Sequence, residues 1–308
     1  MIRHSGRSYG APVGGSVVTA DREDMIQPFK HHPRDWRSNF YVYPVISRRS
    51  GGLSIGVNLN PDKACNFDCV YCQVDRTKPS RLRKVNPARL HDELKDMITD
   101  AVSGALFEDH AFAQTPDSMR RISDIAFSGD GEPTTCKQFR ECVQLAANLK
   151  RDAGLSNTRL VLITDACYLT KPSVVEALAI LDDHQGQIWA KLDAGTEPYF
   201  RKVNRPNYTL AHVMENIIAA AIVRPIVIQS LFMRLHDESP SDAELSAYID
   251  RLNEIVAGGG AVDFVQVYTI ARDPAESYVT SLPDSEVDAI VARVETETDL
   301  RAEAYYGG

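Results

Sequence analysis

The chain has 308 residues, of which 44% are hydrophobic and 25% are charged, and its formal net charge is -8. These values are typical of a globular protein with a full core, and the acidic balance argues against a dedicated nucleic-acid binder, which needs a basic surface. Six cysteines, three of them in one short stretch, do not fit a secreted disulfide scaffold and indicate a metal site in a reducing compartment.

Residues 1–38 are rich in Gly, Ser, Arg and His without periodicity, which predicts an irregular basic extension ahead of one domain over residues 39–308. The extension has no long apolar region, and charged residues and a proline interrupt the most apolar window, residues 213–232. We therefore expect no signal peptide, no membrane span and a cytoplasmic protein. The basic residues of the extension and of the run 76–89 form either a solvated surface or a contact for an anionic partner, nucleic acid included.

Two β-rich runs, residues 40–46 and the strand that begins at Leu53, flank a turn that ends in Gly51 and Gly52. This pattern predicts a hairpin that leads into the first strand of the core. Pro44 places the outer strand at an edge of the sheet, because proline cannot donate a ladder hydrogen bond.

A loop with three cysteines follows this strand. The chain breaks at Asn60-Pro61, and Cys65, Cys69 and Cys72 then stand in a CxxxCxxC spacing. Thiolates at this spacing can converge on one soft metal centre, and both iron–sulfur clusters and structural zinc use them. A closed zinc site needs four ligands, so three cysteines leave a position open.

Helices and strands alternate over the rest of the chain. After the strand at 53–59, the predicted buried strands cover residues 122–127, 159–164, 187–193, 225–231 and 262–268. The predicted helices begin at residues 87, 139, 172, 207, 241 and 285. Strict alternation predicts an α/β fold with a parallel sheet and right-handed crossovers. Six such units predict a partial (β/α)6 TIM-like barrel with a core over about residues 53–296, whose chemistry lies at the carboxyl ends of the strands.

Polar residues mark several of these strand ends. Gly129, Gly131, Glu132 and Pro133 follow the second strand, where the glycines permit close approach of a ligand and the carboxylate can accept from an ammonium group. Lys191 and Asp193 lie on one face of the fourth strand, as a ligand contact or a structural ion pair. The fifth strand carries Gln229, and the sixth carries Val267.

These motifs together resemble the radical S-adenosylmethionine (SAM) superfamily. The resemblance rests on the cysteine loop with Tyr71 before its last cysteine, on the Gly-Asp-Gly-Glu-Pro turn, and on the six-unit pattern. It implies that the three cysteines hold one 4Fe–4S cluster and that SAM chelates the fourth iron. It also implies cleavage of SAM to a radical that abstracts hydrogen from substrate. The residues that it assigns to SAM are Tyr71, Gly129, Gly131, Glu132, Pro133, Lys191, Asp193, Gln229 and, through its backbone, Val267.

Within that superfamily the chain is most similar to the group that includes the tRNA wyosine-base-forming enzymes, on the stretches 60–76, 128–134 and 191–195. That group holds a second cluster on cysteines upstream of the main loop, and no cysteine of this sequence precedes Cys65. The remaining cysteines, Cys136, Cys142 and Cys167, have no tight ligand spacing, so we expect a single cluster. The resemblance further implies an external one-electron donor similar to flavodoxin or ferredoxin. The substrate stays open.

Two other classes of function agree with the same residues. The first is a non-catalytic module that binds zinc or a cluster on the three thiols. The second is an activase that makes a glycyl radical on a partner protein, since such enzymes are often small and hold one cluster.

Overall fold

The structure is a computed structural model of the chain, and it describes residues 36–77 and 84–307. In this part of the chain, one sheet has eight strands in the order β1-β2-β3-β4-β5-β6-β8-β10. Its strands are β1 (Val42–Ser47), β2 (Gly52–Val57), β3 (Ile122–Phe127), β4 (Arg159–Thr164), β5 (Gly186–Lys191), β6 (Ile226–Leu231), β8 (Val262–Tyr268) and β10 (Ala302–Tyr305). No helix among the described residues has both the length and the apolar character needed to cross a membrane.

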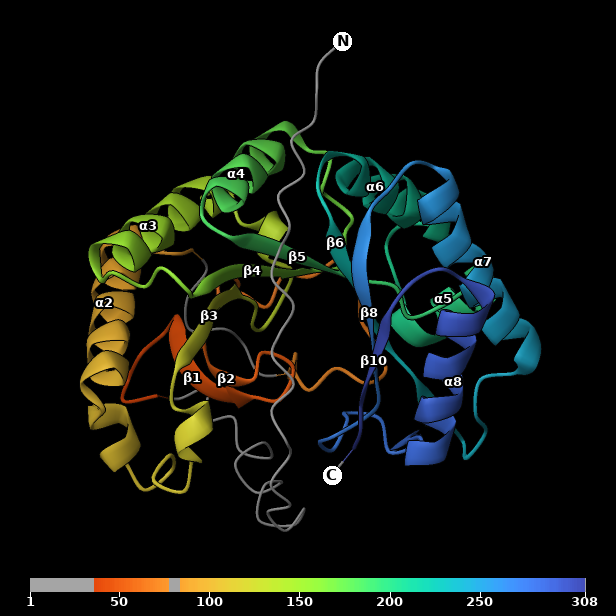
Figure 1. The fold of residues 1–308 in the computed structure, drawn as a ribbon, viewed down its shortest axis with the longest axis horizontal. Coiled ribbons are helices and arrows are strands. Elements are labelled where there is room, and N and C mark those ends of the chain that lie inside the picture. The colour runs from red at the N-terminus through yellow and green to blue at the C-terminus, as the bar shows by residue number, and fades with distance from the viewer. Residues whose placement is uncertain (1–35, 78–83, 308) are drawn as a thin grey trace.

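Helices cover the outer face of the curled sheet (Figure 1). They are α2 (Pro87–Ser103), α3 (Phe139–Asp152), α4 (Pro172–Asp183), α5 (Glu197–Asn204), α6 (Leu210–Val223), α7 (Asp242–Ala257) and α8 (Asp284–Glu297). Short 3-10 turns are η1 (Ala105–Glu108), η2 (Asp117–Met119) and η3 (Pro133–Thr135).

The expected α/β fold with a partial TIM-like barrel is confirmed. Neighbouring strands from β2 to β10 pair in parallel, while β1 pairs antiparallel with β2 and forms one edge of the sheet, as the proline in its sequence indicates. One helix and three strands were not predicted. The helix is α5, and the strands are β10 and the pair β7 (Met233–Leu235) and β9 (Val279–Ser281), which form a two-stranded sheet. The missed strands have three or four residues, too few to show a period of two.

The sheet separates a large outer core from a small inner one. The outer core lies between sheet and helices, and alternate residues of each strand point into it. The inner core, on the concave face, consists of Ala126, Val161, Trp189, Val227 and Phe264. Because these apolar residues fill only part of the concave face, the remaining inward-facing residues of the strands are available to line a site.

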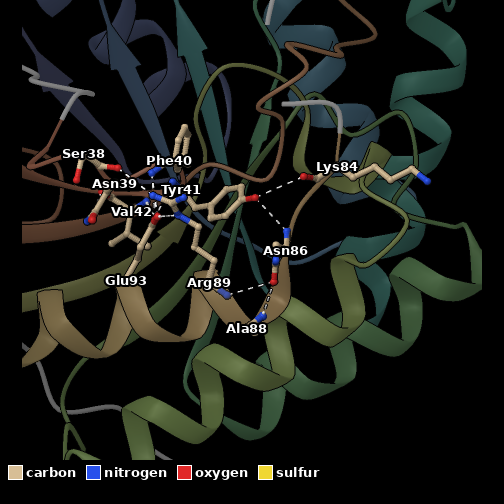
Figure 2. Close-up of polar contacts among 10 residues, drawn as sticks. All are labelled: Ser38, Asn39, Phe40, Tyr41, Val42, Lys84, Asn86, Ala88, Arg89 and Glu93. Atoms are coloured by element: carbon tan, nitrogen blue, oxygen red, sulfur yellow. Dashed lines mark hydrogen bonds and ion pairs between the residues drawn. The ribbon is translucent and has the colours of Figure 1, made fainter. Parts of the chain in front are cut away.

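A buried carboxylate fixes the entry of the chain into β1 (Figure 2). Glu93 of α2 accepts hydrogen bonds from the amides of Phe40, Tyr41 and Val42, the shortest at 2.8 Å. Arg89 donates to the same carboxylate at 2.8 Å, and its guanidinium lies 3.7 Å from the centre of the Phe40 ring. Since these amides precede or begin an edge strand, the Glu93 side chain supplies the acceptors that a neighbouring strand would otherwise supply.

A long-range contact joins the two edges of the sheet. Arg48, in the turn between β1 and β2, donates through Nη1 to the carbonyl of Tyr306 at 2.8 Å, just past β10. Residues 1–35 of the predicted basic extension and residues 78–83 of the predicted basic run lie outside the described residues. Where the description begins, Trp36 is buried and packs edge-on against Phe112, with ring centres 5.2 Å apart.

Candidate active site

The loop after β2 brings three thiols to one cavity. Cys65, Cys69 and Cys72 are half-buried, free of disulfides, and line a cavity of about 180 Å³. Burial of its sulfur raises the pKa of Cys69 to about 11. The Asn204 amide nitrogen lies 3.5 Å from that sulfur, and Arg76 Nη1 lies 3.4 Å from the sulfur of Cys72. Both are hydrogen-bond donors aimed at sulfur, and such donors favour the thiolate form that a metal requires.

Backbone hydrogen bonds hold this loop on two sides. The amides of Asp68 and Val70 donate to carbonyls at the carboxyl end of α5, at 3.0 and 2.9 Å. On the other side, the carbonyl of Ala64 accepts from the amide of Glu132 at 2.9 Å. The cysteine loop is therefore clamped between α5 and the turn that follows β3.

The turn after β3 approaches the cysteine loop so closely that only glycine fits. A Cβ atom on Gly131 would lie 2.0 Å from the carbonyl oxygen of Ala64. Gly129 has a φ of +156°, and a Cβ there would lie 2.5 Å from the Asn58 side chain. Asn58 also donates to the Asp130 carboxylate at 2.8 Å. Both glycines of the predicted motif are thus required by close approach of neighbouring chain segments.

Glu132 is buried at 2% exposure and is already held by four donors. Its Oε1 accepts from the amide and hydroxyl of Thr134 and from the hydroxyl of Thr164, and its Oε2 accepts from the amide of Asp165 at 2.7 Å. Burial raises the pKa of Glu132, and burial together with the nearby Glu132 carboxylate raises that of Asp165. The acceptor capacity that Glu132 retains for a ligand lies mainly on Oε2.

A second polar cluster lies at the end of β5. Lys191 Nζ lies 3.5 Å from the Asp193 carboxylate and donates to the Tyr268 hydroxyl at 3.1 Å. The hydroxyl of Tyr71 and the side-chain amide of Asn204 both donate to Asp193, the latter at 2.8 Å. Burial works most strongly against the charge of Lys191, but the Asp193 carboxylate together with Tyr268 and Cys69 outweighs it and raises the pKa of the lysine. Lys191 therefore stays a cation at the wall of the cysteine cavity.

A larger cavity of about 290 Å³ adjoins the first at the cysteine loop. Tyr71 and Cys72 line both cavities. The larger cavity extends to Arg48 and Arg49 in the β1–β2 turn and to Arg272 in the segment after β8. The cysteine loop thus stands between a small, thiol-lined cavity and a larger, arginine-lined one.

Comparison with known proteins assigns the family. The model of the radical SAM superfamily matches residues 59–245 of this chain, which include the cysteine loop, the turn after β3 and the end of β5. The chain belongs to the radical SAM superfamily. The resemblance inferred from its motifs is confirmed.

Curated relatives of this radical SAM protein are distant and longer than the matched region. It is 25% identical over 252 residues to a protein of Brachyspira hyodysenteriae named GTPase Obg, covering 80% of this chain and 32% of that protein. It is 24% identical over 216 residues to a UPF0026 protein of Helicobacter pylori, covering 68% of this chain and 62% of that protein. The chain thus spans less than two thirds of the length of either relative.

A solved structure shares the fold. TYW1 with a lysine-pyruvate adduct bound is 12% identical to this chain, with a TM-score of 0.51, and the match covers 90% of this chain and 82% of that one. At this level of identity the likeness extends to the fold alone, in agreement with the partial barrel described above.

Most of the predicted site residues of this radical SAM domain line one of the two cavities. They are Cys65, Cys69, Cys72, Tyr71, Gly129, Gly131, Glu132, Lys191 and Gln229. Asp193 and Pro133 line neither cavity. Asp193 is buried and forms an ion pair with Lys191, and Pro133 is buried at the start of η3. The Val267 side chain is in the outer core, so only its backbone can face a ligand.

Several cavity residues were not recognised in the sequence. Arg48 and Arg49 precede a glycine pair and were interpreted as part of a turn, and Tyr268 was treated only as the end of a strand. No local pattern in the sequence indicated that Asn204 contacts both Cys69 and Asp193. The Cys69 contact spans 135 positions of sequence and therefore leaves no local signal.

The arrangement of the three thiols fits an iron–sulfur cluster. A polynuclear cluster takes each thiolate on a different iron, so its ligands surround a cavity rather than meet at one atom. Three thiols around one cavity, with two donors directed at sulfur, match that requirement.

Proposed function

We propose that this protein holds one 4Fe–4S cluster on Cys65, Cys69 and Cys72 and cleaves SAM reductively, so that hydrogen is abstracted from a substrate. When bound and reduced, the cluster supplies the electron that splits SAM into methionine and a 5′-deoxyadenosyl radical. The observation that carries the proposal is the single cavity that the three thiols share with the turn after β3 and with Lys191. Membership of the radical SAM superfamily supports it.

The walls of the thiol-lined cavity carry charges that suit an amino acid. Glu132 retains acceptor capacity on Oε2, and Asp130 lines the same cavity, so carboxylate oxygens are available to an ammonium group. Lys191 offers a cation on the facing wall to a carboxylate. Gly131 lets the backbone of the turn come within contact of whatever the cavity holds.

Tyr71 and Asn204 have a positioning role in this proposal. Both donate to Asp193, which in turn holds Lys191, and Asn204 also lies beside the Cys69 sulfur. The end of β5 is thereby tied to the cysteine loop. A change in one of these residues is expected to disturb both cluster and cation.

The single cluster needs electrons from outside the chain. Each reductive cleavage of SAM takes up one electron, and the resemblance to the superfamily implies that another protein supplies it. We therefore propose an external one-electron donor similar to flavodoxin or ferredoxin as a partner.

The test is anaerobic reconstitution of the full chain with iron and sulfide, followed by dithionite and SAM. We expect on the order of four irons per chain, and 5′-deoxyadenosine detected by mass spectrometry. Cys69→Ala should lose both the iron and the product. Cys136→Ala is the matched control, because this half-buried cysteine lies outside the loop and lines neither cavity.

A folded, iron-loaded wild-type protein that makes no 5′-deoxyadenosine would contradict the proposal and favour a non-catalytic cluster-binding module. Zinc bound at one equivalent in place of iron, with retention of fold, would contradict the cluster itself.

A further inference from the structure

The larger cavity is lined by cations and by no anion among the described residues. Arg48, Arg49 and Arg272 contribute to its wall, and none of the other lining residues is Asp or Glu. The chain as a whole carries a formal net charge of -8. A cavity with the opposite charge, adjoining the cysteine loop, therefore differs from the average surface of the molecule and attracts anions.

Arg49 is held by aromatic faces. Its guanidinium lies 5.0 Å from the centre of the Tyr268 ring and 5.5 Å from that of Trp189. Such contacts fix the plane of the guanidinium and leave its N–H groups available at the edge. Arg49 also interacts electrostatically with Asp124, but that carboxylate is 1% exposed, accepts from Ser54 and does not line the cavity.

Arg48 adds a second cation beside the first. It donates to the Tyr306 carbonyl, which is a neutral acceptor, and burial and the neighbouring Arg49 lower its pKa. Two adjacent guanidinium groups repel each other in a partly buried setting, and a bound oxyanion relieves that repulsion while accepting several charge-assisted hydrogen bonds.

The charges of SAM are matched on the other side of the cysteine loop. Lys191, Asp130 and Glu132 line the thiol cavity and not the larger one. The arginines come from the β1–β2 turn and from the segment after β8, and Cys72 and Tyr71 stand between the two sets. Tyr71, Gly129 and Gln229, which the resemblance assigns to SAM, also line the larger cavity, so SAM would extend into it from the cysteine loop. None of the three arginines is among the residues assigned to SAM, and they mark the part of the cavity that a second molecule would occupy.

We propose that the arginine-lined cavity is the substrate site, and that the substrate is a small molecule with a phosphate or carboxylate group held by Arg49 together with Arg48 and Arg272. This inference rests on the proposed function, in which a substrate must approach the thiol cavity. Because SAM would share this cavity of about 290 Å³, the room beside the arginines suits only a compact metabolite.

The test measures anion binding without any SAM cleavage, so that its failure is distinct from failure of the proposed function. Inorganic phosphate, and separately acetate, is titrated into the full-length, cluster-reconstituted protein at constant ionic strength, and binding is followed by calorimetry. Trp189 gives a second readout in the cluster-free full chain. The protein has two tryptophans, so Trp36→Phe leaves the fluorescence of the ring that Arg49 covers.

Arg49→Gln should weaken binding by about tenfold or more, because charge-assisted hydrogen bonds are lost. The anion affinity of Arg49→Lys should lie between those of the wild type and Arg49→Gln, since lysine keeps the charge but lacks the planar guanidinium. Arg140→Gln is the matched control: it removes the same charge from an exposed ion pair with Glu176, and binding should change by less than about twofold. Arg272→Gln, on the segment after β8, repeats the test if Arg49→Gln does not fold.

Saturable binding of phosphate or acetate, with affinities in the expected order among the variants, supports the site. Comparison of the two affinities tells which oxyanion the site prefers. No saturable binding of either anion would overturn the proposal, as would equal weakening by Arg140→Gln. Loss of anion binding on addition of saturating SAM, without reductant, would also overturn it, because the arginines would then hold the carboxylate of SAM.

Discussion

The amino group of Lys191 lies 3.5 Å from the carboxylate of Asp193, and this buried pair joins four parts of the site. Asp193 Oδ1 accepts the amide of Leu231 in β6 at 2.9 Å, while Oδ2 accepts from Tyr71 in the cysteine loop and from Asn204 in α5. Lys191 itself ends β5. The pair therefore sets the relative positions of two strands, a helix and the cysteine loop.

We expect Asp193→Asn to destabilise the cluster-free protein by about 3–5 kcal/mol, because Lys191 would be left as a buried charge without its carboxylate. Urea unfolding under reducing conditions measures this. Asp182→Asn breaks a surface ion pair with Arg224 and should cost less than about 1 kcal/mol. Equal stability of the two variants would show that the buried pair is dispensable for the fold.

Asp165→Asn is expected to stabilise the cluster-free protein at neutral pH. Asp165 Oδ2 is buried and has no hydrogen-bond partner in the described part of the chain, while Oδ1 accepts from the amide of Cys167 at 3.0 Å. Asparagine keeps that acceptor and removes a charge that faces Glu132. Burial and Glu132 raise the pKa of Asp165.

The sign of the pH dependence follows from that shift. A carboxyl group with a raised pKa in the folded state binds its proton more tightly there than in the unfolded chain. Its favourable contribution is complete below the unfolded pKa, about 3.9, and is lost as pH rises toward the raised folded value. The gain from Asp165→Asn should thus grow between about pH 4 and neutrality. Urea unfolding of both proteins across this pH range measures the gain in stability. The prediction is wrong if the gain does not depend on pH, or if the control Asp250→Asn, at an exposed position, shows the same gain.

Glu93→Ala is expected to lower the free energy of unfolding by about 3 kcal/mol or more, since the backbone amides of Phe40, Tyr41 and Val42 would lose their acceptor. Arg89→Ala removes a partly exposed partner of the same carboxylate and should cost about 1 kcal/mol. Thermal or urea unfolding compares them. If both variants are equally stable, the carboxylate does not fix the start of β1 as Figure 2 indicates.

Gly131→Ala is expected to lower SAM affinity by about tenfold or more, equivalent to roughly 1.4 kcal/mol. Its Cβ would lie 2.0 Å from the Ala64 carbonyl, so the cysteine loop must move. Equilibrium dialysis with SAM and iron analysis measure the effect. Gly104→Ala is the control: it also replaces a loop glycine, with a φ of +87°, but its Cβ meets no atom within 4 Å. Unchanged iron content and SAM affinity in Gly131→Ala would show that the close approach of the two segments is not required.

The sequence predicted those parts of the fold that depend on local pattern. The cap of α2 is an example, since Asn86 accepts from the amides of Ala88 and Arg89 as the Asn-Pro pair indicates. The thiol cavity was predictable because its cysteines and glycines lie in two short motifs. The arginine-lined cavity was not, because it forms only when the β1–β2 turn meets the segment after β8, more than 200 residues later. Glu132 was predicted as a ligand contact. Two of its four protein donors belong to Thr134, two residues further on, and the other two depend on how the end of β4 packs beside it.

The bond between Arg48 and the Tyr306 carbonyl spans 258 positions of sequence. Closing a loop of that length is costly in chain entropy, so the two sheet edges are expected to meet late in folding, after the local helix–strand units have formed. During synthesis, Arg48 leaves the ribosome long before its partner exists. The arginine-lined cavity is therefore one of the last features of the molecule to be completed, and a nascent chain halted before β10 would carry the cysteine loop with that side of the sheet still open.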